Sequence, residues 1–176
     1  MPRKLPSPGP DLHWVFGYGS LIWRQDFPYL DSRRATLAGW ARRFWQGSHD
    51  HRGGADDPGR VVTLVEAPGA ICPGRAFLVR EDVFEHLDHR EKNGYERRDL
   101  SIAFDDGEAI ATTYIASTDN EAFLGPAPLD EMVEQIARSA GESGTNREYV
   151  IELQRALDAL GADDPHVREL AERLSA

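Results

Sequence analysis

The sequence predicts an α+β fold, in which a small mixed or antiparallel β-barrel or sheet has flanking helices and a helical C-terminal region. Three observations favour this class. Segments of β-forming composition dominate the chain before residue 117, one segment of helical spacing lies among them, and three helical segments separated by glycines follow residue 128. The 176 residues suffice to bury the core of a single domain.

The expected strands are short apolar, aromatic or β-branched segments bounded by Gly, Pro and Asp. The clearest is Val-Val-Thr-Leu-Val at residues 61–65, which follows a loop rich in Gly, Asp and Pro at residues 49–59. Pro73-Gly74 is expected to separate two strands, and Asp105-Asp-Gly107 to form a hairpin turn. The strands are therefore expected at residues 14–16, 35–45, 60–66, 74–80, 100–104 and 108–116.

Four segments have helical spacing. The first, residues 81–92, is the helix among the strands, and Asn93-Gly94 stops it as a C-terminal cap would. The other three form the helical C-terminal region, at residues 129–140, 146–160 and 165–174. Residues 1–12 are rich in proline and predict a flexible tail, so the single domain is expected to span residues 13–176.

Composition narrows the class of partner. With 20 basic and 30 acidic residues the net charge is −10, which argues against nucleic acid and against anionic membrane surfaces. No apolar run approaches the roughly 18 residues of a membrane span, and the N-terminus lacks the pattern of a signal peptide. We therefore expect a cytoplasmic protein. Cys72 is the one cysteine, which we interpret as a small buried or loop residue and not a nucleophile.

The stretch FGYGSLIW at residues 16–23 is unusual for the end of a packing strand, because glycine leaves no side chain to bury. A strand that ends in Gly-Tyr-Gly-Ser presents backbone N–H groups that can hold a carboxylate or a developing oxyanion. The hydroxyls of Tyr18 and Ser20 could orient a small polar ligand. The alternative is a plain tight turn or bulge. A dinucleotide site is not indicated, because the third glycine is missing.

Glu91 lies on the apolar face of the predicted helix at residues 81–92. At helical spacing it falls about 20° from Phe84, on the side of Leu87. Burial would raise the pKa of such a carboxyl group towards the range of a general base. The alternative is that Glu91 lies at the frayed helix end, or pairs with an arginine such as Arg97.

Several ordered blocks resemble the ChaC-like γ-glutamylcyclotransferases, a glutathione-specific family. The resemblance extends from Trp14 to about Leu170. The blocks that carry it are WVFGYGSLIW at 14–23, RFWQG at 43–47, DHRG at 50–53, PGRVVTL at 58–64, LDHREKNGY at 87–95 and GESGTNREY at 141–149. It implies a fold built on a small β-barrel with flanking helices, as the composition of the segments also suggests.

The resemblance also implies an activity and its residues. Glutathione would be cleaved to 5-oxoproline and cysteinylglycine, with Glu91 as the catalytic base and no cofactor or metal. The strand end would cradle the γ-glutamyl group through Val15, Phe16, Gly17, Tyr18, Gly19, Ser20 and Leu21. Tyr149 is a further candidate, because its hydroxyl could reach the substrate; the alternative is a packed core tyrosine.

Other interpretations stay open from the sequence. The substrate could be another γ-glutamyl amine or peptide, or the chain could be a non-catalytic regulatory protein of the same fold. His49 and His51 flank Asp50 in the loop, but loop stabilisation or substrate contact is favoured over a metal site there. We expect a monomer or weak homodimer with a small-molecule substrate.

Overall fold

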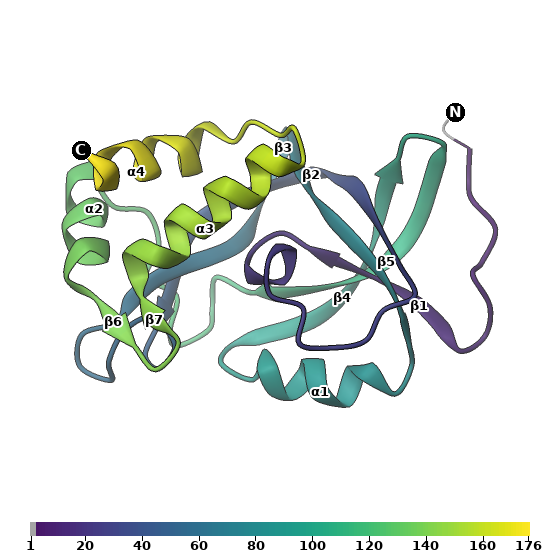
Figure 1. Cartoon of the computed structure of the whole chain (residues 1–176), viewed down its shortest axis with the longest axis horizontal. Coiled ribbons are helices and arrows are strands. Elements are labelled where there is room, and N and C mark those ends of the chain that lie inside the picture. The colour runs from purple at the N-terminus through teal and green to yellow at the C-terminus, as the bar shows by residue number, and fades with distance from the viewer. Residues whose placement is uncertain (1–2) are drawn as a thin grey trace. The chain divides into compact units, whose positions relative to one another are not determined.

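The computed structural model describes residues 3–176 and contains a closed barrel of five strands in the order β1-β3-β2-β4-β5, together with four α-helices in that range (Figure 1). Met1 and Pro2 of the predicted tail lie outside the described residues. The α+β prediction, the barrel and the helical C-terminal region are all confirmed. The chain divides into two compact units, one made of residues up to 41 and 66–115, the other of residues 42–65 and 116–176.

The pairing of the strands explains why the barrel is mixed. β1 pairs antiparallel with β3, from Leu12↔Arg80 to Gly17↔Arg75, and parallel with β5 at Trp14↔Ala111. β2 pairs antiparallel with β4. All six predicted segments are extended, but those at residues 60–66 and 74–80 belong to one strand. The strands are β1 (Leu12–Gly17), β2 (Asp31–Ser48), β3 (Gly59–Arg80), β4 (Tyr95–Phe104) and β5 (Gly107–Ala116).

The predicted break at Pro73-Gly74 is wrong, because β3 runs through both residues. Pro73 lies beyond Arg75, the last residue of β3 that pairs with β1, so its missing N–H costs no bond to that strand. Gly74 serves a close approach: a Cβ there would lie 2.3 Å from the carbonyl oxygen of Gly17. Cys72 lies in the same strand, 2% exposed, in agreement with the expectation of a small buried residue.

α1 (Val83–Arg90) is shorter than the predicted helix. The chain turns after it, and Gly94 takes φ +100°, a left-handed conformation that glycine adopts without strain. The buried face of α1 packs on the core of the first unit, where each fully buried large side chain contributes on the order of 2 kcal/mol. That core consists of Val15, Leu21, Phe27, Phe77, Val79, Val83, Phe84, Leu87 and Tyr114.

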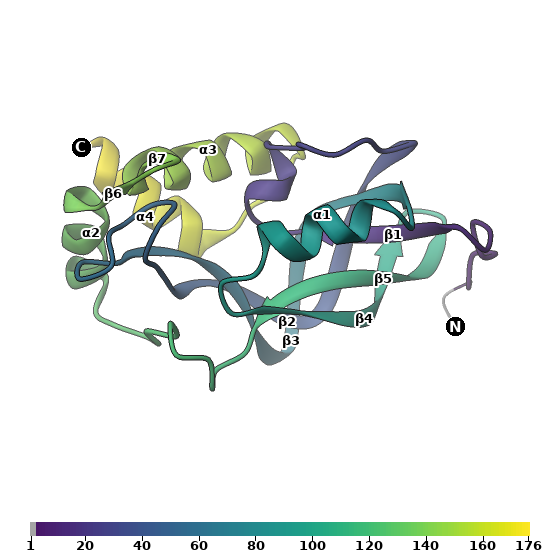
Figure 2. The ribbon, with the colours of Figure 1, turned by 90° about the horizontal axis from the view of Figure 1, so that it is seen from below.

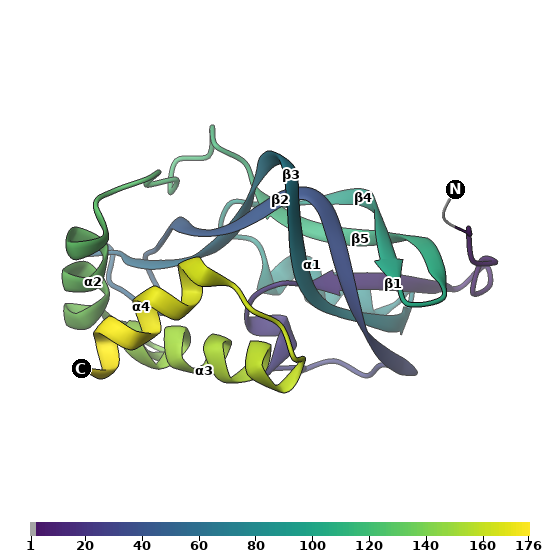
Figure 3. The same ribbon diagram turned by 90° about the horizontal axis from the view of Figure 1, so that it is seen from above.

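The second unit holds the three predicted C-terminal helices, and α3 and α4 lie side by side in it (Figure 3). Thr145 caps α3 by accepting a hydrogen bond from the N–H of Glu148, and Asp164 caps α4 in the same way. Two strands of two residues each, between α2 and α3, were not predicted. The elements are α2 (Leu129–Arg138), β6 (Ala140–Gly141), β7 (Gly144–Thr145), α3 (Asn146–Ala159) and α4 (Pro165–Ser175).

The proline-rich segment begins as an addition to β5. The N–H of Leu5 donates to the carbonyl of Glu108 (2.8 Å), and the N–H of Glu108 donates to the carbonyl of Arg3 (2.7 Å). Residues 5–10 then line a cavity of about 1040 Å³ together with the outer side of α1. The flexibility of this tail and the single-domain boundary stay predictions. Within residues 3–176, no helix combines the length and apolar character needed to span a membrane.

Candidate active site

The strand-end segment (residues 15–21) joins β1 to the short 3₁₀ helix η1 (Ser20–Ile22) in the first unit. Gly17 is required by packing, because a Cβ at this position would lie 2.9 Å from the Cβ of Leu21. The side chains of Val15 and Phe16 are fully buried, so only their backbone could face a ligand. Across residues 3–176, no group accepts a hydrogen bond from the N–H of Gly19, Ser20 or Leu21.

The two hydroxyls of the strand-end segment are already engaged. Tyr18 is 6% exposed and donates its hydroxyl proton to the carbonyl of Tyr114 (2.6 Å). The Ser20 hydroxyl accepts a hydrogen bond from Nη2 of Arg90 (3.0 Å). The segment therefore offers a ligand unpaired backbone N–H groups and one partly buried hydroxyl, since the Tyr18 side chain belongs to the core.

Glu91 follows the last residue of α1, and its N–H donates to the carbonyl of Leu87 (2.9 Å). Its side chain is only 17% exposed, although it lies at a helix end. The carboxylate accepts no hydrogen bond from any described residue, and its ion-pair contact is with Nε of Arg90 at 3.8 Å. Arg97, the partner considered from the sequence, binds Asp88 instead.

Glu91 follows Asp88 by three residues, and the pKa values of these two carboxyl groups are shifted in opposite directions. Burial raises the pKa of the Glu91 carboxyl group above its usual value of 4.5; the charge of Arg90 opposes this rise and that of Asp26 adds to it. Hydrogen bonds from Arg97 lower the pKa of Asp88, and the Tyr114 hydroxyl also donates to it. Asp88 is therefore a paired, ionised carboxylate, whereas burial favours the protonated form of Glu91, so Glu91 is the one of the two suited to accept a proton.

Arg90 brings Glu91 and the strand-end segment together, since its guanidinium contacts both Ser20 and Glu91. Figure 2 shows α1 beside the purple segment that follows β1. Neither Arg90 nor its second partner, Asp26, was predicted from the sequence. Residues 20 and 90 are far apart in the chain, and no periodicity or local motif marks such a contact. The cavity of about 1040 Å³ is lined by other residues, not by Glu91.

Tyr149 belongs to the second unit, where it is 7% exposed. Its hydroxyl accepts a hydrogen bond from the N–H of Val62 (3.3 Å), and its ring packs edge-on against Phe44. The guanidinium of Arg52 lies 5.6 Å from the ring centroid. These contacts favour the packed core tyrosine among the two interpretations, and its contact with substrate stays a prediction.

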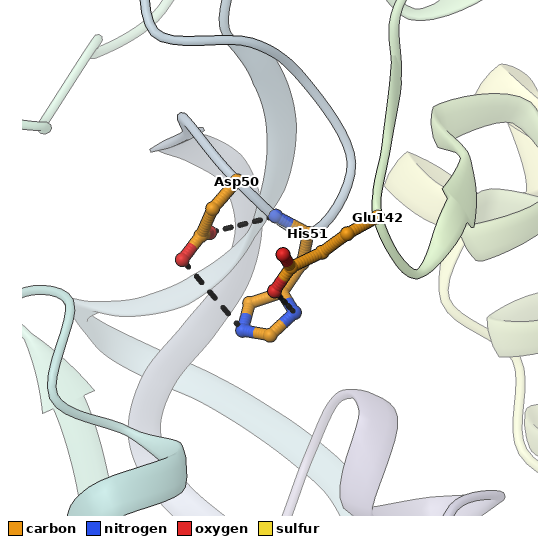
Figure 4. A group of neighbouring side chains, drawn as sticks. All are labelled: Asp50, His51 and Glu142. Atoms are coloured by element: carbon orange, nitrogen blue, oxygen red, sulfur yellow. Dashed lines mark hydrogen bonds and ion pairs between the residues drawn. The ribbon is translucent and has the colours of Figure 1, made fainter.

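The loop at residues 49–57 carries a group of possible metal ligands, Asp50 and His51, which lie beside Glu142 (Figure 4). One ligand atom from each lies within 4.8 Å of the others. The two ring nitrogens of His51 face different carboxylates, Nε2 at 3.9 Å from Asp50 and Nδ1 at 3.7 Å from Glu142. Nδ1 also lies 2.9 Å from the hydroxyl of Ser143. Through these contacts His51 links the two loops. The expectation of no metal stays a prediction.

The first unit therefore combines a proton acceptor with unpaired donors. A carboxylate of raised pKa can take a proton from an ammonium group. Backbone N–H groups that have no partner can stabilise an oxyanion that forms next to them. This set is suited to an acyl transfer in which a nitrogen nucleophile attacks a carbonyl.

Comparisons with known proteins point to one family. A family model described as ChaC-like protein matches residues 13–176. The chain is 42% identical over 175 residues to gamma-glutamylcyclotransferase 2-3 of Arabidopsis thaliana, covering 92% of this chain and 87% of that relative. It is 37% identical over 174 residues to the Homo sapiens glutathione-specific gamma-glutamylcyclotransferase 1, covering 93% and 78%. A crystal structure of a glutathione-specific gamma-glutamyl cyclotransferase from yeast matches with a TM-score of 0.87 at 29% identity, covering 94% of this chain and 96% of that one.

Proposed function

The chain belongs to the ChaC-like family, and on this premise we propose that it is a glutathione-specific γ-glutamylcyclotransferase with Glu91 as its catalytic base. The observation that carries the proposal is the Glu91 carboxylate, which is largely buried, has a raised pKa and accepts no hydrogen bond from the described residues. A carboxylate kept in this state costs stability, and a proton transfer during turnover gives a reason for it.

The reaction closes a five-membered ring. The α-amine of the γ-glutamyl group attacks its own γ-carbonyl carbon, so a new C–N bond forms and the amide bond to cysteine breaks. The α-amine is mostly protonated at neutral pH, so Glu91 first takes a proton from this ammonium group. Glu91 then gives the proton to the departing amine. The products are 5-oxoproline and cysteinylglycine, and no water is consumed.

The strand-end segment supports the other half of the reaction. Ring closure places negative charge on the γ-carbonyl oxygen, and the N–H groups of Gly19, Ser20 and Leu21 are our candidates to receive it. Each such donor typically contributes on the order of 10²-fold to the rate. The backbone at residues 15–18 would hold the glutamyl chain in its folded conformation, which lowers the entropic part of the barrier.

Incubation of the purified protein with glutathione tests this function. We expect 5-oxoproline and cysteinylglycine to appear in equal amounts without added metal or nucleotide. γ-Glutamyl-alanine serves as the comparison substrate. Robust turnover of γ-glutamyl-alanine without turnover of glutathione would instead support a cyclotransferase for another γ-glutamyl compound.

A non-catalytic regulatory role is the remaining alternative, and absence of turnover with both substrates would support it. The buried Glu91 carboxylate and the unpaired N–H groups of the strand-end segment favour an enzyme. We further propose a cytoplasmic location and a monomer or weak homodimer that binds neither nucleic acid nor membrane. The net charge of −10 supports the last part of that proposal.

A further inference from the structure

Arg90, the last residue of α1, contacts several groups near Glu91 that no sequence pattern indicated. Its side chain is 13% exposed. Nη1 donates to the carbonyl of Arg24 (2.8 Å) and to Oδ1 of Asp26 (2.6 Å), while Nη2 donates to the hydroxyl of Ser20 (3.0 Å). Nε lies 3.8 Å from Oε1 of Glu91. One guanidinium therefore joins the helix end, η1 and the chain that follows it.

We propose that Arg90 is a positioning residue for the cyclisation: its guanidinium holds the Glu91 carboxylate beside the strand-end segment. The inference rests on the proposed function, since it concerns the placement of that base. Arg90 acts through Glu91 and Ser20 in this role.

The geometry explains why a linker is needed. The Glu91 carboxylate accepts no hydrogen bond from the described residues, so its position depends on the backbone at the end of α1. That backbone is the last turn of a helix of eight residues, and helix ends fray. The planar guanidinium presents its donors in a fixed fork and binds Ser20, Arg24 and Asp26 at once. This fixes the distance between the base and the N–H groups.

Arg90 also affects the pKa of Glu91 through its charge. The groups that face its carboxylate are Arg90 on α1 and Asp26 on the segment after η1; His86, also on α1, lies 3.2 Å from Asp26. The positive charge of Arg90 favours the ionised carboxylate, whereas Asp26 disfavours it. Loss of Arg90 would therefore raise the pKa of Glu91 further, and loss of the Asp26 charge would lower it.

Arg90→Gln is the direct test, with Arg97→Gln as the matched control. Arg97 also forms an ion pair with an aspartate of α1, but this partner is Asp88, and Arg97 pairs with neither Glu91 nor Ser20. We expect Arg90→Gln to lower kcat for glutathione by on the order of 10²-fold, the usual cost of a misplaced catalytic group, with a smaller change in KM. The acid limb of its pH–rate profile should move to higher pH. Arg97→Gln should leave both properties unchanged.

Two further variants separate position from charge. Arg90→Lys keeps the charge but not the fork, so we expect kcat to fall while the acid limb stays near that of the wild type. Asp26→Asn should move the acid limb to lower pH, opposite to Arg90→Gln. Asp26 is half-exposed, so this variant remains informative if Arg90→Gln fails to fold.

The outcomes distinguish this inference from the function on which it rests. Wild-type activity together with an unchanged kcat and acid limb in Arg90→Gln would overturn the role of Arg90 alone. A fall in kcat with no movement of the acid limb in either Arg90→Gln or Asp26→Asn would also overturn it, because a structural role suffices for that result. A wild type inactive on glutathione and on γ-glutamyl-alanine would overturn the proposed function, and the role of Arg90 with it.

Discussion

A buried pair in the second unit and a buried carboxylate in the first differ in their hydrogen bonding. In the second unit, Arg60 is 6% exposed and donates to Gln135, to the carbonyl of Phe44 and to that of Gly125. Asn146 is fully buried and exchanges two hydrogen bonds with the backbone of Arg60. In the first unit, Glu91 accepts no hydrogen bond from the described residues. A buried polar group with a hydrogen-bond partner stabilises the fold, whereas a buried polar group without one costs stability and can bind a ligand.

The same contrast appears in how the two units respond to protons. The Glu91 carboxyl in the first unit has a raised pKa, and burial in the second unit lowers the pKa of His166 to about 4. In each case burial disfavours the charged form. His166 uses its neutral state structurally, because Nε2 accepts a hydrogen bond from the N–H of Phe44 (3.0 Å). Glu91 has no such structural use, so its proton affinity is available for chemistry.

The largest effect that this comparison predicts is from Glu91→Gln. General acid–base catalysis contributes about 10²–10⁴-fold, so we expect turnover of glutathione to fall by about a thousandfold. Binding and fold should be kept. A raised folded-state pKa stabilises the protein only at low pH and loses that contribution as pH rises, so the amide should not lower Tm at pH 7.

Initial rates and thermal unfolding measured on the same samples test both statements. Glu85→Gln is the matched control, because Glu85 is an exposed glutamate on the same helix. Near-normal turnover in Glu91→Gln would remove this carboxyl group from the mechanism and with it the contrast between the units.

The next effect concerns stability in acid. The pKa of His166 falls from 6.5 to about 4 on folding, through burial first and then the charges of Arg43 and Arg42; Asp164 acts in the opposite direction. The unfolded chain therefore binds a proton that the folded chain resists. Stability should be full above pH 6.5 and decrease by about 3 kcal/mol as pH falls to about 4.

Urea unfolding of the wild type and of His166→Gln across this pH range measures that loss. The glutamine should make stability less dependent on pH, even if it lowers stability at neutral pH. An equal slope in both proteins would mean that another group controls the acid response.

A smaller effect is expected from Gly19→Val. A branched side chain next to the unpaired N–H groups should obstruct the γ-glutamyl group and lower kcat/KM by at least about tenfold, the size of one or two lost contacts. Gly54→Val is the control, because a Cβ at residue 54 would meet no atom within 4 Å. If the kinetic constants of Gly19→Val match those of the wild type, the cradle lies elsewhere.

Local sequence patterns predicted the helices and the longer strands, but not how the strands continue and pair. The β-branched run at residues 61–65 and the glycines after residue 128 marked the strands and helices correctly. Pro73-Gly74 was misread, because a close approach between strands and a turn both select glycine. β6 and β7 have two residues each, too few for any periodicity to show. Closure of the barrel likewise depends on pairing that is distant in the sequence. Composition left a sheet and a barrel open, and the family resemblance favoured the barrel.

The candidate site was predictable in part. Helical spacing nominated Glu91, but its side chain is shielded at a helix end, one residue beyond the regular turns from which the spacing was argued. Gly-Tyr-Gly-Ser indicated backbone donors, and the N–H groups of residues 19–21 have no partner among the described residues. Arg90 could not be found in this way, since its contact with Ser20 joins residues 70 positions apart.

The buried sulfur in β3 has a consequence for a cell under oxidative stress. Glutathione disulfide exchanges readily with accessible thiolates, but Cys72 is 2% exposed and this chain has no second cysteine with which it could form a disulfide. We therefore expect the chain to resist glutathionylation. Its rate would then follow the supply of the tripeptide and not the oxidation state of the protein.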